Sequence, residues 1–292
     1  MKSLKITDVS VGGLSLFLQN ANINSPQFLD IRKDLIISRA HTNERNFVKM
    51  HQLQTSSIMK FPTKLPENFV GVKFCLNKLS NMLNILDIFN ISKLDLLTAE
   101  FDLKEDKSTG FFIATSLLLY DIDKKLKIRI NAGNSELISY MGDEPWKKFS
   151  STDEMLLKFD INREFINKLK KLVSLDLSEA STALKKNSGC LMVVSDDGGI
   201  KFTSVNENSW SIVYDLNLNN DIKTKPKPNI GKDFIINVPI RLIDAMEREY
   251  YTLFLVKNTK MMENSPVHIY VLYNNKDSIY VTGTQLFDPN LV

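Results

Sequence analysis

The sequence lacks the residue patterns that mark most catalytic and metal-binding sites. Its three histidines, His41, His51 and His268, are scattered, and none stands at metal-ligand spacing from a cysteine, aspartate or glutamate. It has no Walker phosphate loop, no GxGxxG fingerprint and no GxSxG nucleophile elbow. The stretch DDGG at 196–199 has no further acidic residues at alternate positions, so it indicates a turn rather than a calcium loop. We therefore expect a protein that is not an enzyme and that holds no metal ion and no cofactor.

Long apolar runs and paired cysteines are also missing. No run of about 18 apolar residues could cross a bilayer, and the opening MKSLKITDVS lacks the apolar core and cleavage site of a signal peptide. The two cysteines, Cys75 and Cys190, lie far apart among apolar residues, which favours buried free thiols over a disulfide. We expect a protein of the reducing cytoplasm with no membrane contact.

Charge of one sign is not in large excess. The chain has 292 residues, with 37 Lys+Arg against 34 Asp+Glu, a net charge of +3. This balance is too mild to indicate a nucleic-acid partner, so only the placement of the cations can argue for one. With 43% hydrophobic residues the chain is long enough for two cores, and two domains are the ordinary expectation at this length.

What the sequence does contain is a repeated order of secondary-structure elements. The first half is expected to open with a weak helix at 8–21, loosened by Gly12 and Gly13. A strand at 70–76 then runs directly into a helix at 77–89, whose apolar residues recur at helical spacing. The other apolar, β-branched runs of this half predict strands at 27–31, 34–40, 45–53, 94–102, 110–121 and 126–132.

The second half repeats that order. A helix is predicted at 161–173, and a strand at 233–237 enters a helix at 238–249, with Pro239 in its first turn. The DDGG stretch is a hairpin signal between the first two strands of this half. Its strands are predicted at 190–195, 200–205, 210–218, 251–257, 267–273 and 278–284.

Each half is thus expected to contain a helix, three strands, a strand that enters a helix, and three more strands. The segment 134–155 is polar, carries Pro145 and is typical of a linker, and the basic segment 219–232 is typical of a loop. We predict an α+β fold of two topologically equivalent domains, at 1–133 and 156–292, joined by a connector at 134–155. Because the helices have one apolar side, each domain should be an antiparallel sheet with two helices on one face.

The stretch DINREFINKLKKLV, residues 160–173, has a basic side opposite its apolar one. Its apolar residues share an arc of about 140° at helical spacing, while Arg163, Asn167, Lys170 and Lys171 lie opposite, with Lys168 at the margin. Such a face is most often simply solvated, and the alternative is that it meets a phosphate backbone. The other helices have mostly neutral, hydrogen-bonding outer sides, apart from one arginine pair. These sides carry Asn77, Asn81, Asn84, Arg241 and Arg248.

Two halves, each with two helices on one side of a β-sheet, resemble the DNA sliding clamps, the ring-shaped processivity factors of DNA polymerases. The likeness is greatest to T-even-phage-type clamps, whose two-domain subunits close as trimers. It covers most of the chain and lies in the order and spacing of elements rather than in a signature motif. The segments that carry it are 27–53, 73–86, 158–175, 196–218 and 233–246.

The resemblance implies that the helices line a central channel and that topology, rather than base readout, keeps the protein on DNA. It implies duplex DNA without sequence preference, a DNA polymerase and a clamp loader as partners, in phage or viral replication in the host cytoplasm. The residues implied to face DNA are Arg163, Asn167, Lys168, Lys170, Lys171, Arg241, Arg248, Asn77, Asn81 and Asn84.

The resemblance also implies a subunit interface and a client site. In clamps the last strand of the first domain pairs with the third strand of the neighbour's second domain, which here corresponds to 126–132 and 210–216 of a homotrimer. Client peptides enter an apolar pocket beside the linker and the C-terminal segment; alternatively, Trp146 only anchors the linker. The implied interface residues are Ile128, Ile130, Trp210, Ile212 and Tyr214, and the implied pocket residues are Met141, Trp146, Phe149, Leu286 and Phe287.

Two other functions stay open on the sequence. Herpesvirus processivity factors share the two-domain fold but bind DNA as open monomers through a basic surface, and the net charge of +3 fits that variant. A non-enzymatic structural or interaction protein of a virus would instead use the basic helix only as solvated surface. Molecular size and DNA dependence separate the ring from the scaffold: a ring forms a trimer and stimulates a polymerase, and a scaffold does neither.

Overall fold

The chain divides into two compact units, Met1–Asp143 and Glu144–Val292, which are described separately. The computed structural model describes residues 1–20, 27–41, 47–105, 111–134, 155–179, 189–195, 199–206, 210–215, 234–257, 267–273, 277–284 and 286–287. The predicted loop at 219–232 and nearly all of the predicted connector at 134–155 lie outside these residues. The domain boundaries therefore stay a prediction.

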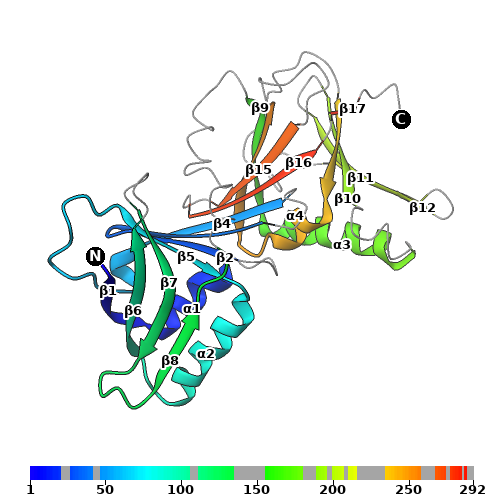
Figure 1. Ribbon diagram of the computed structural model, residues 1–292. Coiled ribbons are helices and arrows are strands. Elements are labelled where there is room, and N and C mark those ends of the chain that lie inside the picture. Colours follow the sequence, from blue (N-terminus) through cyan, green and yellow to red (C-terminus); the bar gives the residue numbers. More distant parts are fainter. Residues whose placement is uncertain are drawn as a thin grey trace. The chain divides into compact units, whose positions relative to one another are not determined.

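The first unit contains two helices and a large sheet (Figure 1). Its elements are β1 (Ser3–Ser10), α1 (Val11–Asn20), β2 (Gln27–Ile31), β3 (Leu35–His41), β4 (Phe47–Gln54), the 3-10 turn η1 (Thr55–Ser57), β5 (Gly71–Leu76), α2 (Leu79–Ile91), β6 (Leu96–Glu105), β7 (Phe111–Tyr120) and β8 (Lys127–Asn131).

The second unit has the same order of elements. They are β9 (Met155–Asn162), α3 (Arg163–Glu179), β10 (Gly189–Val194), β11 (Ile200–Asn206), β12 (Trp210–Asp215), β13 (Phe234–Pro239), α4 (Ile240–Ala245), β14 (Tyr250–Lys257), β15 (Val267–Tyr273), β16 (Ser278–Thr284) and β17 (Leu286–Phe287).

Strand pairing shows that the two units are topologically equivalent. The antiparallel pairs β1–β6, β2–β5, β2–β3 and β3–β4 of the first unit correspond to β9–β14, β10–β13, β10–β11 and β11–β12 of the second. Likewise β6–β7 and β7–β8 correspond to β14–β15 and β15–β16. The hairpin predicted between 190–195 and 200–205 is confirmed by the β10–β11 pair. The repeat inferred from the order of elements is therefore a repeat of sheet topology.

The first sheet departs from a purely antiparallel arrangement at β7. The start of β7, from Phe111 to Ile113, pairs in parallel with β5, while its end pairs antiparallel with β8. The two neighbours thus share one edge of β7, and the main-chain N–H of Gly133, just after β8, donates to the carbonyl of Cys75 on β5. This leaves β8 as a short edge strand that is tied to β5 at one end.

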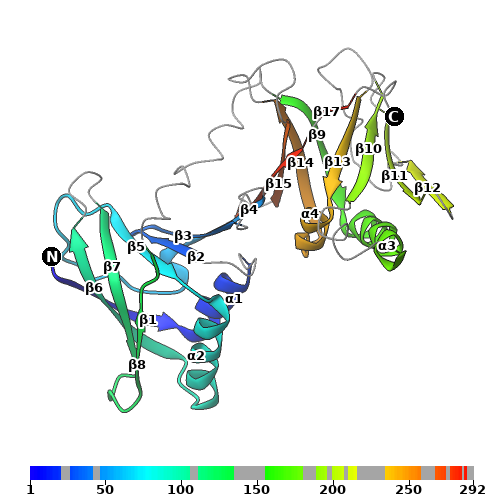
Figure 2. The ribbon, with the colours of Figure 1, turned by 45° about the vertical axis from the view of Figure 1, so that its right-hand side comes forward.

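The two helices of the first unit cover the same face of its sheet. Figures 1 and 2 both show α1 and α2 on one side of β6, β7 and β8. The apolar side of each helix enters one continuous core with the strands, as the one-sided patterns predicted. The buried helix residues are Val11, Leu14, Phe17, Leu18, Leu79, Met82, Leu86 and Phe89.

Each opening helix is preceded by a strand that the sequence interpretation missed. Residues 8–10 belong to β1, and Ile161 and Asn162 belong to β9, so the predictions of a helix at 8–21 and at 161–173 were wrong at their starts. In both cases a polar residue at the end of the strand caps the helix. The Ser10 hydroxyl accepts the N–H of Gly13, and the Asn162 carboxamide oxygen accepts the N–H of Phe165.

The cysteine prediction is confirmed, because Cys75 and Cys190 are both buried and free. Within the described residues, no helix is long and apolar enough to cross a membrane.

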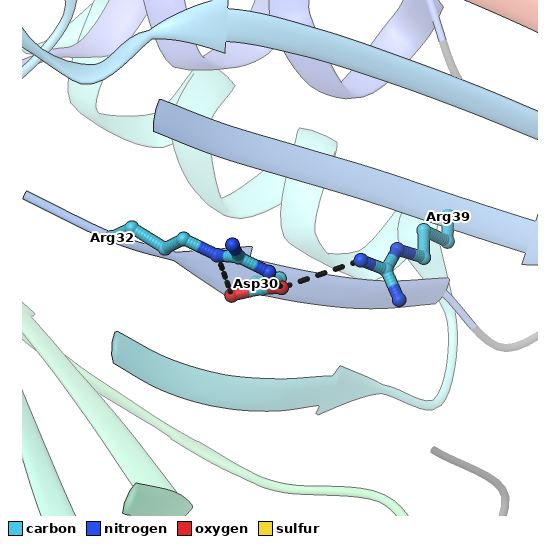
Figure 3. A network of polar contacts seen from close by, with 3 residues as sticks. All are labelled: Asp30, Arg32 and Arg39. Carbon is cyan, nitrogen blue, oxygen red and sulfur yellow. Dashed lines mark hydrogen bonds and ion pairs between the residues drawn. The ribbon is translucent and has the colours of Figure 1, made fainter. Parts of the chain in front are cut away.

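The sheet face opposite the helices of the first unit holds a largely buried ionic network (Figure 3). The Asp30 carboxylate on β2 accepts two hydrogen bonds from Arg32, at 3.2 and 2.7 Å, and one from Arg39 on β3, at 3.3 Å. Asp30 and Arg39 are only 3% and 4% exposed. Two guanidinium groups thus share one buried carboxylate, and the network links two neighbouring strands.

Asp30→Asn should destabilise the protein by about 3 kcal/mol, because the substitution leaves the buried Arg39 guanidinium without its carboxylate. Urea unfolding monitored by circular dichroism measures the change. The control is Lys125→Ala, which removes the solvent-exposed Lys125–Asp123 pair and should leave the midpoint unchanged. Equal midpoints for Asp30→Asn and Lys125→Ala would contradict the structural role of the network.

Burial raises the pKa of the Cys75 thiol to about 11, although a hydrogen bond from the main chain of Gly133 acts in the opposite direction. Since the thiolate is the reactive form, native Cys75 should react with a thiol reagent at pH 8 at least about a hundredfold more slowly than in the denatured chain. Rates measured in a Cys190→Ala background isolate Cys75. Similar rates in buffer and in denaturant would contradict the expected burial.

Candidate nucleic-acid interface

The basic helix α3 is held in the second unit by its apolar side. Phe165, Ile166, Leu169 and Leu172 are buried, and the Phe165 ring meets the Phe202 ring of β11 edge-on at 5.1 Å between centroids. The helix also continues beyond the predicted end, to Glu179. Because the buried positions recur at helical spacing, the polar positions between them are left on the other side of α3.

Two of the α3 cations contact main-chain carbonyl groups near the end of α4. The Lys170 ammonium donates to the carbonyl of Asp244 at 3.3 Å, and the Arg163 guanidinium donates to the carbonyl of Glu247. Carbonyls at a helix C-terminus carry partial negative charge and lack helical partners, so cations stabilise them. The structure therefore joins α3 and the α4–β14 turn into one basic surface of the second unit.

The other polar residues of α3 lie along the same helix. Lys171 and Asn167 are exposed, and Lys168 is half-buried with its ammonium 3.1 Å from the Glu164 carboxylate one turn earlier. Pairs of this i, i+4 kind on a surface contribute only a few tenths of a kcal/mol, so Glu164 holds Lys168 weakly. The residues inferred from sequence to form the basic side of α3 are thus brought together by the structure.

Helix α4 is shorter than the sequence predicted. The expected helix at 238–249 spans only Ile240–Ala245, with Val238 and Pro239 in β13. Arg241 stays on the helix, but Arg248 lies in the turn that follows it; both side chains are half-buried. The prediction that placed Arg248 on the outer side of a helix was therefore wrong, because the chain leaves the helix at Met246.

The carboxylate of Asp244 is part of this basic surface. Burial raises its pKa above the usual value, and the nearby Lys170 ammonium acts in the opposite direction. An aspartate with a raised pKa destabilises the folded state as pH rises through its range, so Asp244 costs some stability at neutral pH. It also offsets part of the positive charge that Lys170 brings.

The helices of the first unit present a different, nearly neutral surface. Asn81 and Asn84 are exposed on α2, as the sequence predicted. Asn77 is exposed as well, but it precedes α2, which begins at Leu79, so its assignment to the helix was wrong. Its side chain stays close to Gly133, where any added Cβ would lie 2.2 Å from the Asn77 amide oxygen. Asn77 therefore belongs to the junction between β5 and β8.

Exposed apolar residues on these helices were not expected from the sequence. Leu16 on α1 is 56% exposed, and Ile88 and Ile91 on α2 are 46% and 82% exposed. They lie outside the apolar arcs that pack on the sheet. Their helical spacing from the buried residues places them on the other side of each helix, so periodicity was a signal that could have identified them.

Alternate residues of β8 direct their main-chain groups toward β7, and the residues between them direct theirs away from it. The N–H of Ala132 donates to the carbonyl of Thr115, and paired and unpaired positions alternate along an antiparallel ladder. Ile128 and Ile130 therefore direct their main-chain groups toward β7, and their half-buried side chains pack on the core. The β8 residues whose main-chain groups face the other edge are Lys127, Arg129 and Asn131.

Contacts on the outer face hold β8 in place. The Arg129 guanidinium donates to the Asp102 carboxylate on β6 at 2.7 Å and to the Ser116 hydroxyl on β7 at 3.0 Å. The Ser116 hydroxyl in turn donates to Asp102 at 2.6 Å. These hydrogen bonds hold the pKa of Asp102 below its usual value, the Ser116 bond being the larger cause. Within the described residues, no second strand pairs with β8.

The other implied interface strand is also an edge strand in its own sheet. Residues Trp210, Ile212 and Tyr214 lie on β12, which pairs with β11 and with no other described strand of the second unit. Leu286 and Phe287 form β17, which pairs with β13. Met141, Trp146 and Phe149 lie outside the described residues. In the described part of the chain, no group of three His, Cys, Asp or Glu side chains is arranged to hold a metal ion.

Comparison with known proteins gives matches in structure rather than in sequence. No protein-family model and no curated protein matches the chain. The structure is similar to the DNA polymerase III beta subunit of Thermotoga maritima, with a TM-score of 0.60 at 12% identity over 97% of this chain. It is also similar to PCNA of Thermococcus kodakaraensis, with a TM-score of 0.56 at 9% identity over 97% of this chain.

The lengths of these matches differ. The chain covers 65% of the length of the Thermotoga beta subunit but 100% of the Thermococcus PCNA. For PCNA of A. fulgidus, the TM-score is 0.55 at 11% identity, over 99% of both chains. The fold is therefore that of the sliding clamps, with two topologically equivalent α+β domains, as the sequence predicted.

Proposed function

We propose that the chain is a subunit of a DNA sliding clamp, which encircles duplex DNA and tethers a replicative DNA polymerase. The observation that supports this most is the basic side of α3, which lies on the helix layer of a clamp fold. Cations on a helix layer attract the phosphate backbone without reading the sequence of bases. The resemblance to T-even-phage-type clamps further suggests a role in phage or viral replication.

The hydrogen bonds of Arg163 and Lys170 with carbonyl groups are compatible with DNA binding. An ammonium has three donors and a guanidinium five, and each of these side chains uses one in the bond to the α4–β14 turn. Their remaining donors are sufficient to bind phosphate oxygens. The nearly neutral helices of the first unit would meet DNA through Asn81 and Asn84, directly or through water. Because the cations of α3 are combined with nearly neutral helices in the first unit, the total attraction to DNA stays weak, as sliding requires.

The proposed assembly is a homotrimer closed by strand pairing. The outward main-chain groups of β8 would pair with β12 of the next subunit and so continue the sheet. The full-length match to two PCNA chains supports a two-domain subunit. A clamp loader would open such a ring, and client peptides would enter a pocket formed by Met141, Trp146, Phe149, Leu286 and Phe287. Solved relatives include a Helicobacter pylori beta clamp bound to a DNA ligase peptide.

Replacing Lys168, Lys170 and Lys171 together with Glu should abolish DNA-dependent polymerase stimulation, because three phosphate-facing cations become anions. Polymerase extension on a primed circular template measures the effect. The matched control replaces Lys2, Lys64 and Lys104, which lie outside the helices and outside β8, with Glu and should stimulate normally. Circular dichroism checks that both variants fold. Normal stimulation by the α3 variant would overturn the proposed role of the basic helix.

Lys127→Pro combined with Asn131→Pro should convert the oligomer to monomers, because proline removes two N–H donors from the outward edge of β8. Mass photometry measures the size, and the control is the same pair of positions changed to Ala. Ile128→Pro is a poorer test, since the N–H of Ile128 faces β7 and its loss disrupts the unit itself. A wild-type monomer that still binds duplex DNA would instead support the open, herpesvirus-like form.

A further inference from the structure

After α4 the N–H of Met246 still donates to the carbonyl of Ile243, but the next two N–H groups do not continue the helix. In a longer helix the N–H of Arg248 would donate to the carbonyl of Asp244, and the N–H of Glu247 to that of Ile243. Here both N–H groups donate instead to the hydroxyl oxygen of Tyr251 on β14, each at 3.0 Å. The carbonyl of Asp244 accepts Lys170 in place of an amide.

Tyr251 is well placed to hold this turn. Its side chain is fully buried, and its ring packs against the rings of Tyr273 and Tyr280, each at 5.8 Å between centroids. Its hydroxyl lies 3.5 Å from that of Tyr280, which gives its own proton a neighbouring acceptor. Burial raises the pKa of the Tyr251 hydroxyl, so the group stays neutral and accepts the two amide hydrogen bonds across the physiological range.

Two consequences follow for the carbonyl groups of the turn. Since Arg248 donates to Tyr251, the Asp244 carbonyl is left for the Lys170 ammonium. Since the chain has left the helix, the Glu247 carbonyl is left for the Arg163 guanidinium. The positions of two cations on α3 thus depend on a buried hydroxyl on β14, which is not exposed to any DNA.

We propose that Tyr251 is a positioning residue of the DNA-binding surface, which ends α4 early and thereby fixes Arg163 and Lys170 against the turn. The inference rests on the proposed function. It predicts that the buried hydroxyl influences how many phosphates the surface neutralises without touching DNA itself. If Tyr251 had a purely structural role, its substitution would change the stability of the protein but not the salt dependence of DNA binding.

The test compares Tyr251→Phe with Tyr273→Phe in the full-length chain. Both changes delete one hydroxyl from neighbouring rings, but that of Tyr273 makes no hydrogen bond within the described residues. Affinity for a linear duplex is measured across a series of salt concentrations. Tyr251→Phe should weaken binding by about fivefold at low salt, a usual size for coupling between neighbouring groups. It should also reduce the salt slope by about 0.9 for each phosphate that the surface no longer neutralises, whereas Tyr273→Phe should change neither quantity.

A double-mutant cycle links the hydroxyl to the cation. In an Arg163→Ala background, Tyr251→Phe should have a smaller effect on affinity than in the wild-type background, because the guanidinium that it positions is gone. Fully additive effects, or an unchanged salt slope in Tyr251→Phe, would overturn the inference and leave the clamp proposal intact. If Arg163→Ala and the triple Glu variant both bind duplex normally, the proposed function fails and the inference fails with it.

Hydrogen exchange in the wild-type protein tests the premise without any variant. The amides of Glu247 and Arg248 should be protected, since both donate to a buried oxygen although they lie outside helix and sheet. Exchange at the rate of an exposed loop would overturn the proposal, whether or not Tyr251→Phe folds.

Discussion

One-sided packing of amphipathic helices on a sheet is the constraint on which the other features of this protein depend. Apolar residues at helical spacing require each helix to bury one side, and in the first unit α1 and α2 cover the same face of the sheet. The polar side of every helix is then left outward by default. Any function of the helix layer must therefore come from the residues on that side, and these differ sharply between α2 and α3.

Main-chain hydrogen bonding decides how the outward residues are used. At the end of α4, carbonyl groups that a longer helix would have satisfied accept Lys170 and Arg163 instead, so two cations are tied to the backbone. At β8, alternation along the ladder leaves the main-chain groups of Lys127, Arg129 and Asn131 without a described partner strand. In both places the regular hydrogen bonding of a secondary-structure element ends. The proposed clamp would use the end of α4 to hold cations for DNA, and the edge of β8 to pair with a neighbouring subunit.

The similarity to beta subunits and PCNA at 9–13% identity has a physical explanation. A clamp domain requires apolar residues at certain periodicities, strand ends that cap helices, and a fixed pairing order, and many residues satisfy each requirement. Sequence-independent attraction to phosphates likewise requires cations on a face rather than particular residues at particular positions. Such a fold is compatible with sequences that share almost nothing residue by residue.

The sequence by itself determined the repeated order of elements, the apolar sides of α1, α2 and α3, and the basic side of α3, because periodicity is a local property. The caps Ser10 and Asn162 were readable signals for the helix starts, yet the strands before them were missed, since 8–10 and 161–162 also fit the helical pattern. The length of α4 was decided by the tertiary structure. Nothing in residues 238–249 indicates that Tyr251, buried on β14, captures the amides of Glu247 and Arg248. The partners of Arg163 and Lys170 are likewise distant in the chain, and only the packing of α3 beside α4 brings them together.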